Sequence, residues 1–241
     1  MQPNEYLDVI TRESAALADA AERAGVDALV PSCPGWTVAD LVTHVGEIQQ
    51  WASITVEQRA TERISRRSLP PAPPATDVVH WFREQTAALV STLAATDSAT
   101  PVWSWTDANT AHFWFRRQAH EVAVHRWDAE RAARSEHTLD TGIAADGVDE
   151  CLAMLPFRNR DVLLGSGETV HLHCTDTNGE WLVTLAANGP VIERVHAKGD
   201  VAARGTASDL DLFVWGRVGP STFQVFGDAE LLERFQAATR A

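Results

Sequence analysis

Apolar residues recur at helical spacing in four segments of the first half of the chain. These segments are residues 5–25, 38–63, 76–96 and 111–134. An apolar stripe repeated every three to four residues is typical of a helix that buries one face. The breakers PSCPGW, SLPPAPPAT and TDSATPVWSWTDANT separate the segments, and the first helix stops at Gly25. Four helices with one long connection predict an up-and-down four-helix bundle.

The second of these helices has a recognisable start and an inward-facing histidine. Thr37 can cap it, with Asp40 three residues later as the reciprocal partner of a capping box. His44 falls beside Leu41 and Ile48 on the apolar face. The pattern therefore predicts His44 in the bundle interior, where a histidine is either a hydrogen-bonded core residue or a ligand.

Short alternating and β-branched runs replace the helical pattern beyond Ser135. The runs ETVHLHCTD, EWLVTLAANG and ERVHAKGDVAARG are bounded by glycine turns and predict strands. TASDLDLFVWGR predicts a helix capped near Ser208, STFQVFG a strand, and DAELLERFQAATR a terminal amphipathic helix. We therefore predict an α+β chain with a helical bundle in residues 1–145 and a smaller α/β domain in residues 146–241.

Composition and charge narrow the choice of partners. The 241 residues are 45% hydrophobic, which is enough for a sizeable core. The formal net charge of −13 would repel nucleic acid and anionic membranes, so a small molecule is the expected partner. No membrane span and no signal peptide are visible, which predicts a cytoplasmic protein. The oligomeric state stays open.

Cysteine usage agrees with a reducing compartment. Cys33, Cys151 and Cys174 are odd in number and widely spaced, which favours reduced thiols over a disulfide framework. Cys33 stands just before a predicted helix start, where a thiol can gain thiolate character. The alternative is a small residue packed at a turn.

The stretch HEVAVHRWDAE in the fourth predicted helix places possible metal ligands on one face. A helix turns about 100° per residue, so Glu121 and His125 lie about 40° apart, whereas His120 and His125 diverge by about 140°. Glu121 and His125 are thus the natural ligand pair, or else a helix-surface pair. A catalytic zinc ion usually needs a third protein ligand. Asp128 could orient an imidazole or form an ion pair with Arg131.

Three motifs together carry a resemblance to a known family. CPGWTVADLVTHVGEIQQW, RQAHEVAVHRWDAE and SDLDLFVWGR, in this order, resemble the mycothiol-dependent maleylpyruvate isomerase family of DinB-like metal-binding helical bundles. The resemblance spans nearly the whole chain and implies a DinB-like four-helix bundle followed by a smaller α/β domain. It also implies a divalent metal, usually zinc, held here by His44, Glu121 and His125. The helical-face geometry selects the same pair on the fourth helix.

The resemblance also implies a thiol chemistry. A metal held by two imidazoles and one carboxylate keeps a net positive charge, so it stabilises a thiolate at neutral pH. In the family the thiol is mycothiol, a cosubstrate that adds to a cis-enedioate, permits rotation and leaves. Other members of the wider superfamily transfer the same thiol to electrophiles. We therefore expect a metal-dependent, mycothiol-using isomerase or S-transferase acting on a small, anionic electrophile. The alternative is a non-catalytic or repurposed ligand-binding or tailoring member of the same fold.

Arginines are the expected contacts for an anionic substrate. The family pattern implies Arg217, in SDLDLFVWGR, as a catalytic residue at the electrophile pocket, with a surface ion pair to Asp209 or Asp211 as the alternative. Arg117 stands four residues before Glu121 on the ligand face, so it is a candidate for binding the cofactor or a substrate anion.

One further histidine pair stands in the second half of the chain. His171 and His173 alternate on a predicted strand and therefore share a face, which can form a metal pair in principle. The sequence shows no third ligand nearby, so they are predicted to be solvent-facing strand residues.

Overall fold

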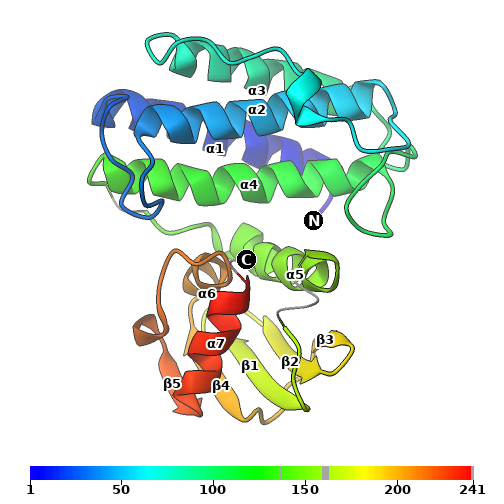
Figure 1. The fold of residues 1–241 in the computed structure, drawn as a ribbon, viewed down its shortest axis with the longest axis vertical. Coiled ribbons are helices and arrows are strands. Elements are labelled where there is room, and N and C mark those ends of the chain that lie inside the picture. The colour runs from blue at the N-terminus through cyan, green and yellow to red at the C-terminus, as the bar shows by residue number, and fades with distance from the viewer. Residues whose placement is uncertain (136, 159–162, 240–241) are drawn as a thin grey trace. The chain divides into compact units, whose positions relative to one another are not determined.

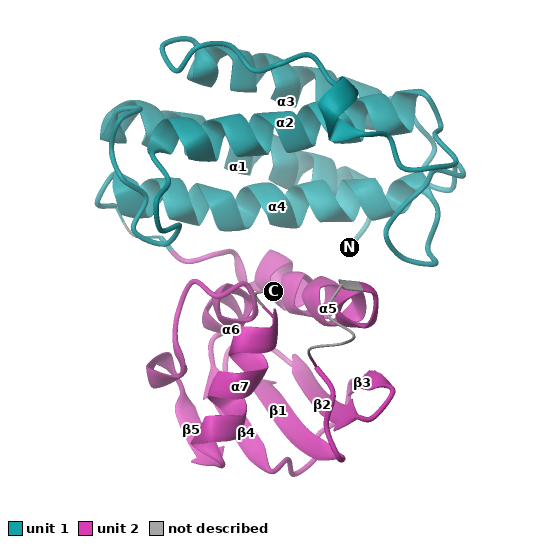
Figure 2. Cartoon of the chain, viewed as in Figure 1, with its two compact units in different colours: residues 1–137 teal, residues 138–241 magenta. Residues whose placement is uncertain are grey.

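A computed structural model describes residues 1–135, 137–158 and 163–239. The chain forms two compact units, Met1–His137 and Thr138–Ala241 (Figure 1, Figure 2). Among the described residues, none of the helices combines the length and the apolar character of a membrane-spanning segment.

The first unit is a bundle of four helices, as the apolar pattern predicts. They are α1 (Pro3–Ala24), α2 (Val38–Glu57), α3 (Val78–Ala94) and α4 (Ala111–Ala132), with a short 3-10 helix, η1 (Arg66–Ser68), after α2. α1 packs mainly against α4 and α3, and α2 mainly against α3 and α4. The consecutive helices α1 and α2 therefore lie across the bundle from each other, and α2 and α4 are neighbours.

The helices α1, α2 and α4 each end at or shortly before a residue with a positive φ. α1 ends at the predicted Gly25, whose φ is +83°. α2 and α4 end earlier than predicted, at Glu57 and Ala132. Soon after each end, a residue other than glycine adopts a left-handed backbone, Arg59 with φ of +47° and Arg134 with φ of +55°. Such values are uncommon outside glycine, so no breaker in the sequence marks these two ends.

The second unit is a five-stranded sheet with three helices. The helices are α5 (Thr141–Arg158), α6 (Ala207–Val214) and α7 (Ala229–Thr239), and a short 3-10 helix, η2 (Pro220–Thr222), precedes the last strand. The strands are β1 (Glu168–Cys174), β2 (Glu180–Ala186), β3 (Gly189–Glu193), β4 (Val201–Gly205) and β5 (Gln224–Gly227). Their order is β3-β2-β1-β4-β5, with β1 and β4 parallel and the other neighbours antiparallel.

One face of this sheet packs against the helices. Val170 and Leu172 of β1, Val183 of β2 and Ala203 of β4 are fully buried on it. β1 contacts α6 and α7, β4 contacts α7, and α5 contacts β3 and α6 (Figure 1). Side chains alternate between faces along a strand, so the intervening residues lie on the opposite face.

The second unit begins with a helix, α5, that the sequence does not predict. The sequence predicts no helix here, because Gly142, Gly147 and Pro156 interrupt the apolar pattern. Gly147 serves packing instead, since a Cβ at this position would lie 2.5 Å from a carboxylate oxygen of Asp211 on α6. The predicted boundary near residue 145 lies within α5, whereas the compact units divide between residues 137 and 138. The change from helical spacing to alternating apolar residues marks the start of the strands, and α5 comes before it.

Candidate metal centre

The three side chains proposed as metal ligands from the sequence lie together in the first unit. His44 projects from α2, and Glu121 and His125 project from successive turns of α4. Glu121 Oε1 lies 3.2 Å from His44 Nε2 and 3.3 Å from His125 Nε2. One ligand atom from each residue lies within 4.8 Å of the other two. The adjacency of α2 and α4 in the bundle brings the histidine of one helix to the pair on the other.

The cluster lies at the edge of the bundle core and is open on one side. The side chain of His44 is 29% exposed, that of Glu121 17% and that of His125 9%. A small ligand can therefore reach the cluster from the side of His44. Trp36 flanks the cluster, with its ring centroid 5.0 Å from the ring of His44 and 6.4 Å from that of His125.

Glu121 is held as a carboxylate. Burial alone would raise its pKa, but hydrogen bonds from His125 and His44 and the charge of Arg117 outweigh burial and lower the pKa well below its usual value. Arg117 Nη2 lies 3.0 Å from Glu121 Oε2, and the arginine is itself buried. Arg117 thus binds the Glu121 oxygen that faces away from the histidines. Its predicted contact with a cofactor or substrate stays a prediction.

The second ring nitrogen of His125 is bound by a buried carboxylate. His125 Nδ1 lies 2.8 Å from Asp128 Oδ2, and Asp128 is fully buried. Ser32 Oγ donates to Asp128 Oδ1 at 2.6 Å, and Cys33 Sγ donates to Oδ2 at 3.5 Å. A carboxylate accepts hydrogen bonds, so Nδ1 carries the proton and Nε2 faces Glu121. Asp128 is thus in position to orient the imidazole, which is one of the two alternatives that the sequence left open.

The surroundings of His125 favour a cation at its Nε2. Burial would lower the pKa of His125, but the hydrogen bonds to Asp128 and Glu121 outweigh burial and raise it. A proton or a metal ion bound to Nε2 would give the ring a positive charge, which both carboxylates stabilise. A ring nitrogen oriented by a carboxylate on its far side is the usual arrangement of a metal-ligating histidine.

Sequence reasoning missed the contribution of the turn before α2. Cys33, His125 and Asp128 form a second group whose ligand atoms lie within 4.8 Å of one another, and it overlaps the first group at His125. Cys33 and Asp128 are 95 positions apart in the chain. No periodicity links the PSCPGW turn to α4, so only the folded bundle brings them together.

His120 lies on another face of α4, as the helical angle predicts. It is fully buried, and its ring packs edge-on against Tyr6 of α1, with centroids 6.2 Å apart. It belongs to none of the metal-capable groups found among the described residues. The spacing of five residues thus directs His120 towards a different helix from His125.

Arg217, the predicted catalytic arginine, lies in the second unit. α6 ends at Val214, so Arg217 stands in the turn that follows this helix. Its Nη1 donates a hydrogen bond to the carbonyl oxygen of Trp215 at 2.8 Å, and the side chain is half-buried. Its role at an electrophile pocket stays a prediction.

The prediction that His171 faces solvent and that no third ligand lies near the two histidines is wrong. His171 is buried, and Glu180 and His196 join the two histidines in a group whose ligand atoms lie within 4.8 Å of one another. A signal was present in the sequence, since the turn between the two predicted strands sets the register that places Glu180 opposite His173. His196 comes from a connection whose path has no sequence signature.

Comparison with known proteins gives matches over both units. Residues 7–130 match the family model of the mycothiol maleylpyruvate isomerase N-terminal domain, and residues 142–234 match that of the MDMPI C-terminal domain. No curated protein matches the chain. Among solved structures, the mycothiol-dependent maleylpyruvate isomerase has a TM-score of 0.65, and a histidine-to-alanine mutant of that enzyme has a TM-score of 0.66. Each is 12% identical, over 93% of both chains, so this likeness shows a shared fold. By the two family matches, the chain belongs to the mycothiol-dependent maleylpyruvate isomerase family.

Proposed function

We propose that this chain is a metal-dependent enzyme that uses mycothiol, either to isomerise a substrate of the maleylpyruvate type or to transfer mycothiol to an electrophile. Membership of the family supports the use of mycothiol. The observation that carries the metal dependence is the approach of His44 Nε2 and His125 Nε2 to Glu121 Oε1, at 3.2 and 3.3 Å. We propose zinc as the ion.

The donor set suits a divalent transition metal. Two imidazole nitrogens and one carboxylate oxygen form a common catalytic zinc set, which leaves a fourth position for an exogenous ligand. Zinc bonds of about 2.0–2.1 Å place neighbouring tetrahedral ligands roughly 3.3 Å apart, close to the distances between Glu121 and the two histidines. A zinc ion at these atoms would supply a positive charge that keeps a thiol ionised near neutral pH.

The chain's own residues prepare these ligands. Asp128 holds the Nδ1 proton of His125, so the lone pair of Nε2 is available. Arg117 binds Glu121 Oε2, which leaves Oε1 directed at the histidines. The exposed edge of His44 is the side from which a thiol can approach. Each contact orients a ligand atom before anything binds, so little reorganisation is needed.

For the electrophile, we propose Arg217 as a contact for a substrate carboxylate. Its guanidinium carries five N–H donors in a planar fork that matches a carboxylate. Arg117 is the second arginine that we propose near the thiol or an anionic substrate group, in addition to its bond to Glu121. Both assignments apply to either reaction, because an isomerase and a transferase share the addition of the thiol.

A turnover assay tests the proposal and separates the two reactions. The zinc-loaded full chain is mixed with mycothiol and maleylpyruvate, and both substrate and free thiol are followed. An isomerase consumes the substrate and leaves the free thiol unchanged, whereas a transferase consumes one thiol for each electrophile. If maleylpyruvate does not react, other electrophiles are tested in the same assay.

The decisive variant is His125→Ala. We expect it to bind one equivalent of zinc less than wild type and to lose thiol-dependent turnover, with its helix content, measured by circular dichroism, unchanged. His80→Ala is the matched control, because His80 is an exposed histidine on α3 beside Glu84. Full zinc content and full turnover in His125→Ala would contradict the proposal, as would wild-type protein that fails to use mycothiol with any electrophile.

A further inference from the structure

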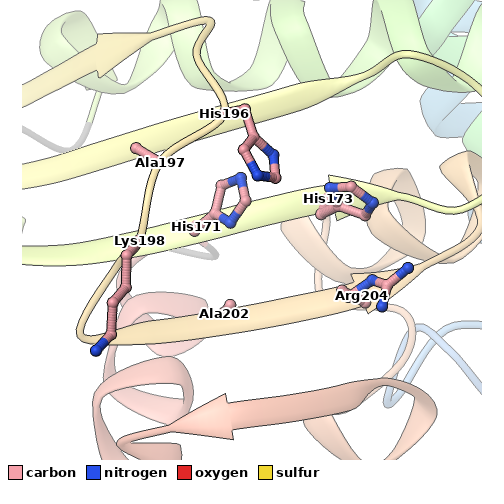
Figure 3. A pocket seen from close by; sticks show the side chains of 7 residues that line it. All are labelled: His171, His173, His196, Ala197, Lys198, Ala202 and Arg204. Atoms are coloured by element: carbon pink, nitrogen blue, oxygen red, sulfur yellow. The ribbon is translucent and has the colours of Figure 1, made fainter.

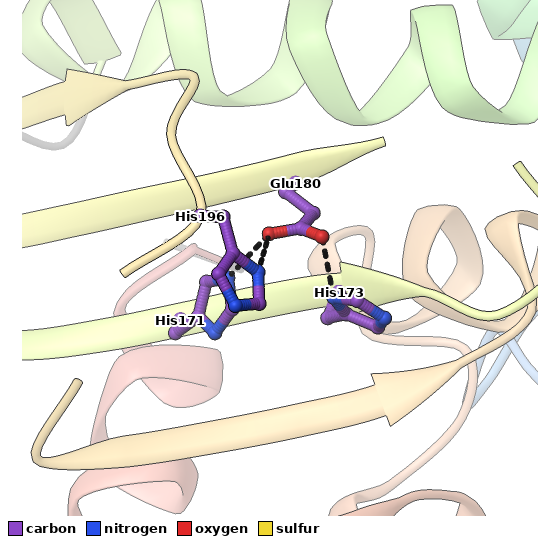
Figure 4. Close-up of side chains that lie close together, drawn as sticks. All are labelled: His171, His173, Glu180 and His196. Atoms are coloured by element: carbon purple, nitrogen blue, oxygen red, sulfur yellow. Dashed lines mark hydrogen bonds and ion pairs between the residues drawn. The ribbon is translucent and has the colours of Figure 1, made fainter. Parts of the chain in front are cut away.

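The second unit contains a cluster of four potential metal ligands (Figure 4). His171 and His173 come from β1, Glu180 is the first residue of β2, and His196 comes from the connection between β3 and β4. One ligand atom from each lies within 4.8 Å of the other three. All four lie in the second unit, so the cluster is complete within it.

The fold of the sheet brings these residues together. His171 and His173 are two residues apart on β1, so both lie on the face opposite the buried Val170 and Leu172. In the antiparallel pairing of β1 with β2, Glu180 is the direct partner of His173. Two strands therefore place three ligands on one face by register alone.

The fourth ligand arrives on a connection that runs close to β1. A Cβ at Gly199 would lie 2.7 Å from the carbonyl oxygen of Val201 and 3.1 Å from the backbone nitrogen of His171. Only glycine permits this approach without a shift of the backbone. The close approach carries His196 over the face that bears the other two histidines (Figure 3).

Glu180 contacts all three imidazoles. Its Oε1 is 2.9 Å from His173 Nδ1, and its Oε2 is 2.6 Å from His196 Nδ1 and 3.4 Å from His171 Nε2 (Figure 4). The ring centroids are 5.9, 6.0 and 6.2 Å apart, so the rings form a nearly equilateral triangle. Three imidazoles that share one carboxylate can hold a cation together with it, because each supplies a ring nitrogen as a ligand atom.

His171 gives an independent indication of a missing ligand. Its side chain is only 7% exposed, and its Nε2 is buried without a hydrogen-bond partner among the described residues. The contact with Glu180 at 3.4 Å is within ion-pair range but does not have hydrogen-bond geometry. A buried nitrogen without a partner costs free energy, and a metal ion bound to its lone pair would remove that cost.

A pocket gives access to the cluster from solvent (Figure 3). It has a volume of about 490 Å³, and its lining includes all three histidines. Lys198 and Arg204 also line it, and their charges disfavour loosely held cations. Imidazole-rich ligand sets select transition metals over magnesium and calcium, which prefer oxygen.

We propose that His171, His173, His196 and Glu180 form a second metal site, for zinc or a similar divalent transition metal. Four protein ligands match the closed coordination of a structural zinc site. The ion ties the connection that carries His196 to strands β1 and β2. The competing arrangement is a metal-free network in which Glu180 accepts hydrogen bonds from protonated histidines.

The test uses the full chain with the first centre disabled by His125→Ala. After chelation, protein is reloaded with zinc, dialysed and analysed for metal. We expect His125→Ala to retain one equivalent and the double variant His125→Ala/His196→Ala to retain none. His196 is 82% exposed, so its replacement does not disturb the core. His125→Ala/His80→Ala is the matched control and should keep one equivalent.

Cobalt adds a spectroscopic readout. In the His125→Ala background, bound Co²⁺ should give a visible absorption that is lost in the variant that also carries His196→Ala. Equal zinc and cobalt binding in these two variants, or no binding by His125→Ala, would overturn the second site. Failure of the first centre is distinguishable, since it appears as equal metal content in wild type and His125→Ala.

Discussion

At the scale of single residues, Asp128 determines what His125 can do. It is fully buried, accepts hydrogen bonds from Ser32 and Cys33, and binds the Nδ1 proton of His125. A carboxylate in this position fixes the tautomer and the ring orientation of a metal-ligating histidine. Under the proposed function, metal binding at His125 therefore depends on Asp128, which is not one of the three proposed ligands.

Asp128→Asn tests this dependence. The amide preserves the shape of the side chain but loses the negative charge, so we expect metal affinity to fall about 10–100-fold, the usual effect of removing such an outer partner. Competition with a chromophoric chelator measures the affinity. Asp97→Asn, on a loop and bonded to the backbone of Ala99, is the control. An unchanged affinity in Asp128→Asn would show that Asp128 only fills space.

The sequence predicts which residues lie together where the helical period links the partners. Glu121 and His125 are one turn apart, so their shared face is visible in the sequence. Asp128 was visible as an alternative for the same reason. Cys33 and His196 were not, because the turn and the connection that carry them have no periodicity.

At the scale of elements, the start of α2 fixes the position of His44. Thr37 and Asp40 form the predicted capping box, in which Thr37 Oγ1 accepts from the backbone nitrogen of Asp40 and Asp40 Oδ2 accepts from that of Thr37. His44 lies two turns further on, on the face towards α4. The cap satisfies backbone donors that the first turn would otherwise leave without partners.

Thr37→Ala should destabilise the bundle by about 0.5–2 kcal/mol, the usual cost of losing such a cap. Urea unfolding followed by helical circular dichroism measures the change. Thr11→Ala is the matched control, because Thr11 is an exposed threonine within α1, and alanine has the higher helix propensity there. Equal stability of wild type and Thr37→Ala would show that the Thr37 cap does not stabilise the bundle.

In the second unit, Glu168 links the start of β1 to α7. It accepts hydrogen bonds from backbone nitrogens, including that of Ser166, and from Arg234. The hydrogen bond with its own backbone is the largest cause that lowers the pKa of Glu168 to about 2, and those from Ser166 and Arg234 add to it. Since the folded-state pKa is below the usual value of 4.5, this contribution to stability is present above that pH.

Glu168→Gln should therefore lower the melting temperature at neutral pH, and the difference from wild type should shrink as the pH falls from about 4.5 towards about 2. Thermal unfolding at a series of pH values measures it. Glu233→Gln, an exposed glutamate on α7, is the control. A difference that is constant over this pH range would contradict the role of the ionised carboxylate.

Element-level prediction was good for the bundle and incomplete elsewhere. The four helices of the first unit carry apolar stripes, so their existence follows from the sequence. α5 was missed because Gly147 serves close packing against Asp211, a requirement that only the folded second unit reveals. The early ends of α2 and α4 lie at arginines with positive φ, which are not recognisable as breakers.

At the scale of the whole molecule, the two family matches account for both units. The resemblance carried by three motifs named the same family and the same α+β architecture, although the solved structures with this fold are only 12% identical to the chain. The second ligand cluster was not foreseen. It requires the sheet register and the path of one connection together, and neither alone brings four ligands to one point.

The central claim is that His44, Glu121 and His125 hold a metal ion, and anomalous diffraction tests it most directly. Crystals of the zinc-loaded chain would be measured on both sides of the zinc absorption edge. We predict an anomalous peak about 2.0–2.2 Å from His44 Nε2, Glu121 Oε1 and His125 Nε2. Zinc-loaded crystals with no peak between these three atoms, or with a peak only at Cys33 and Asp128, would contradict the claim.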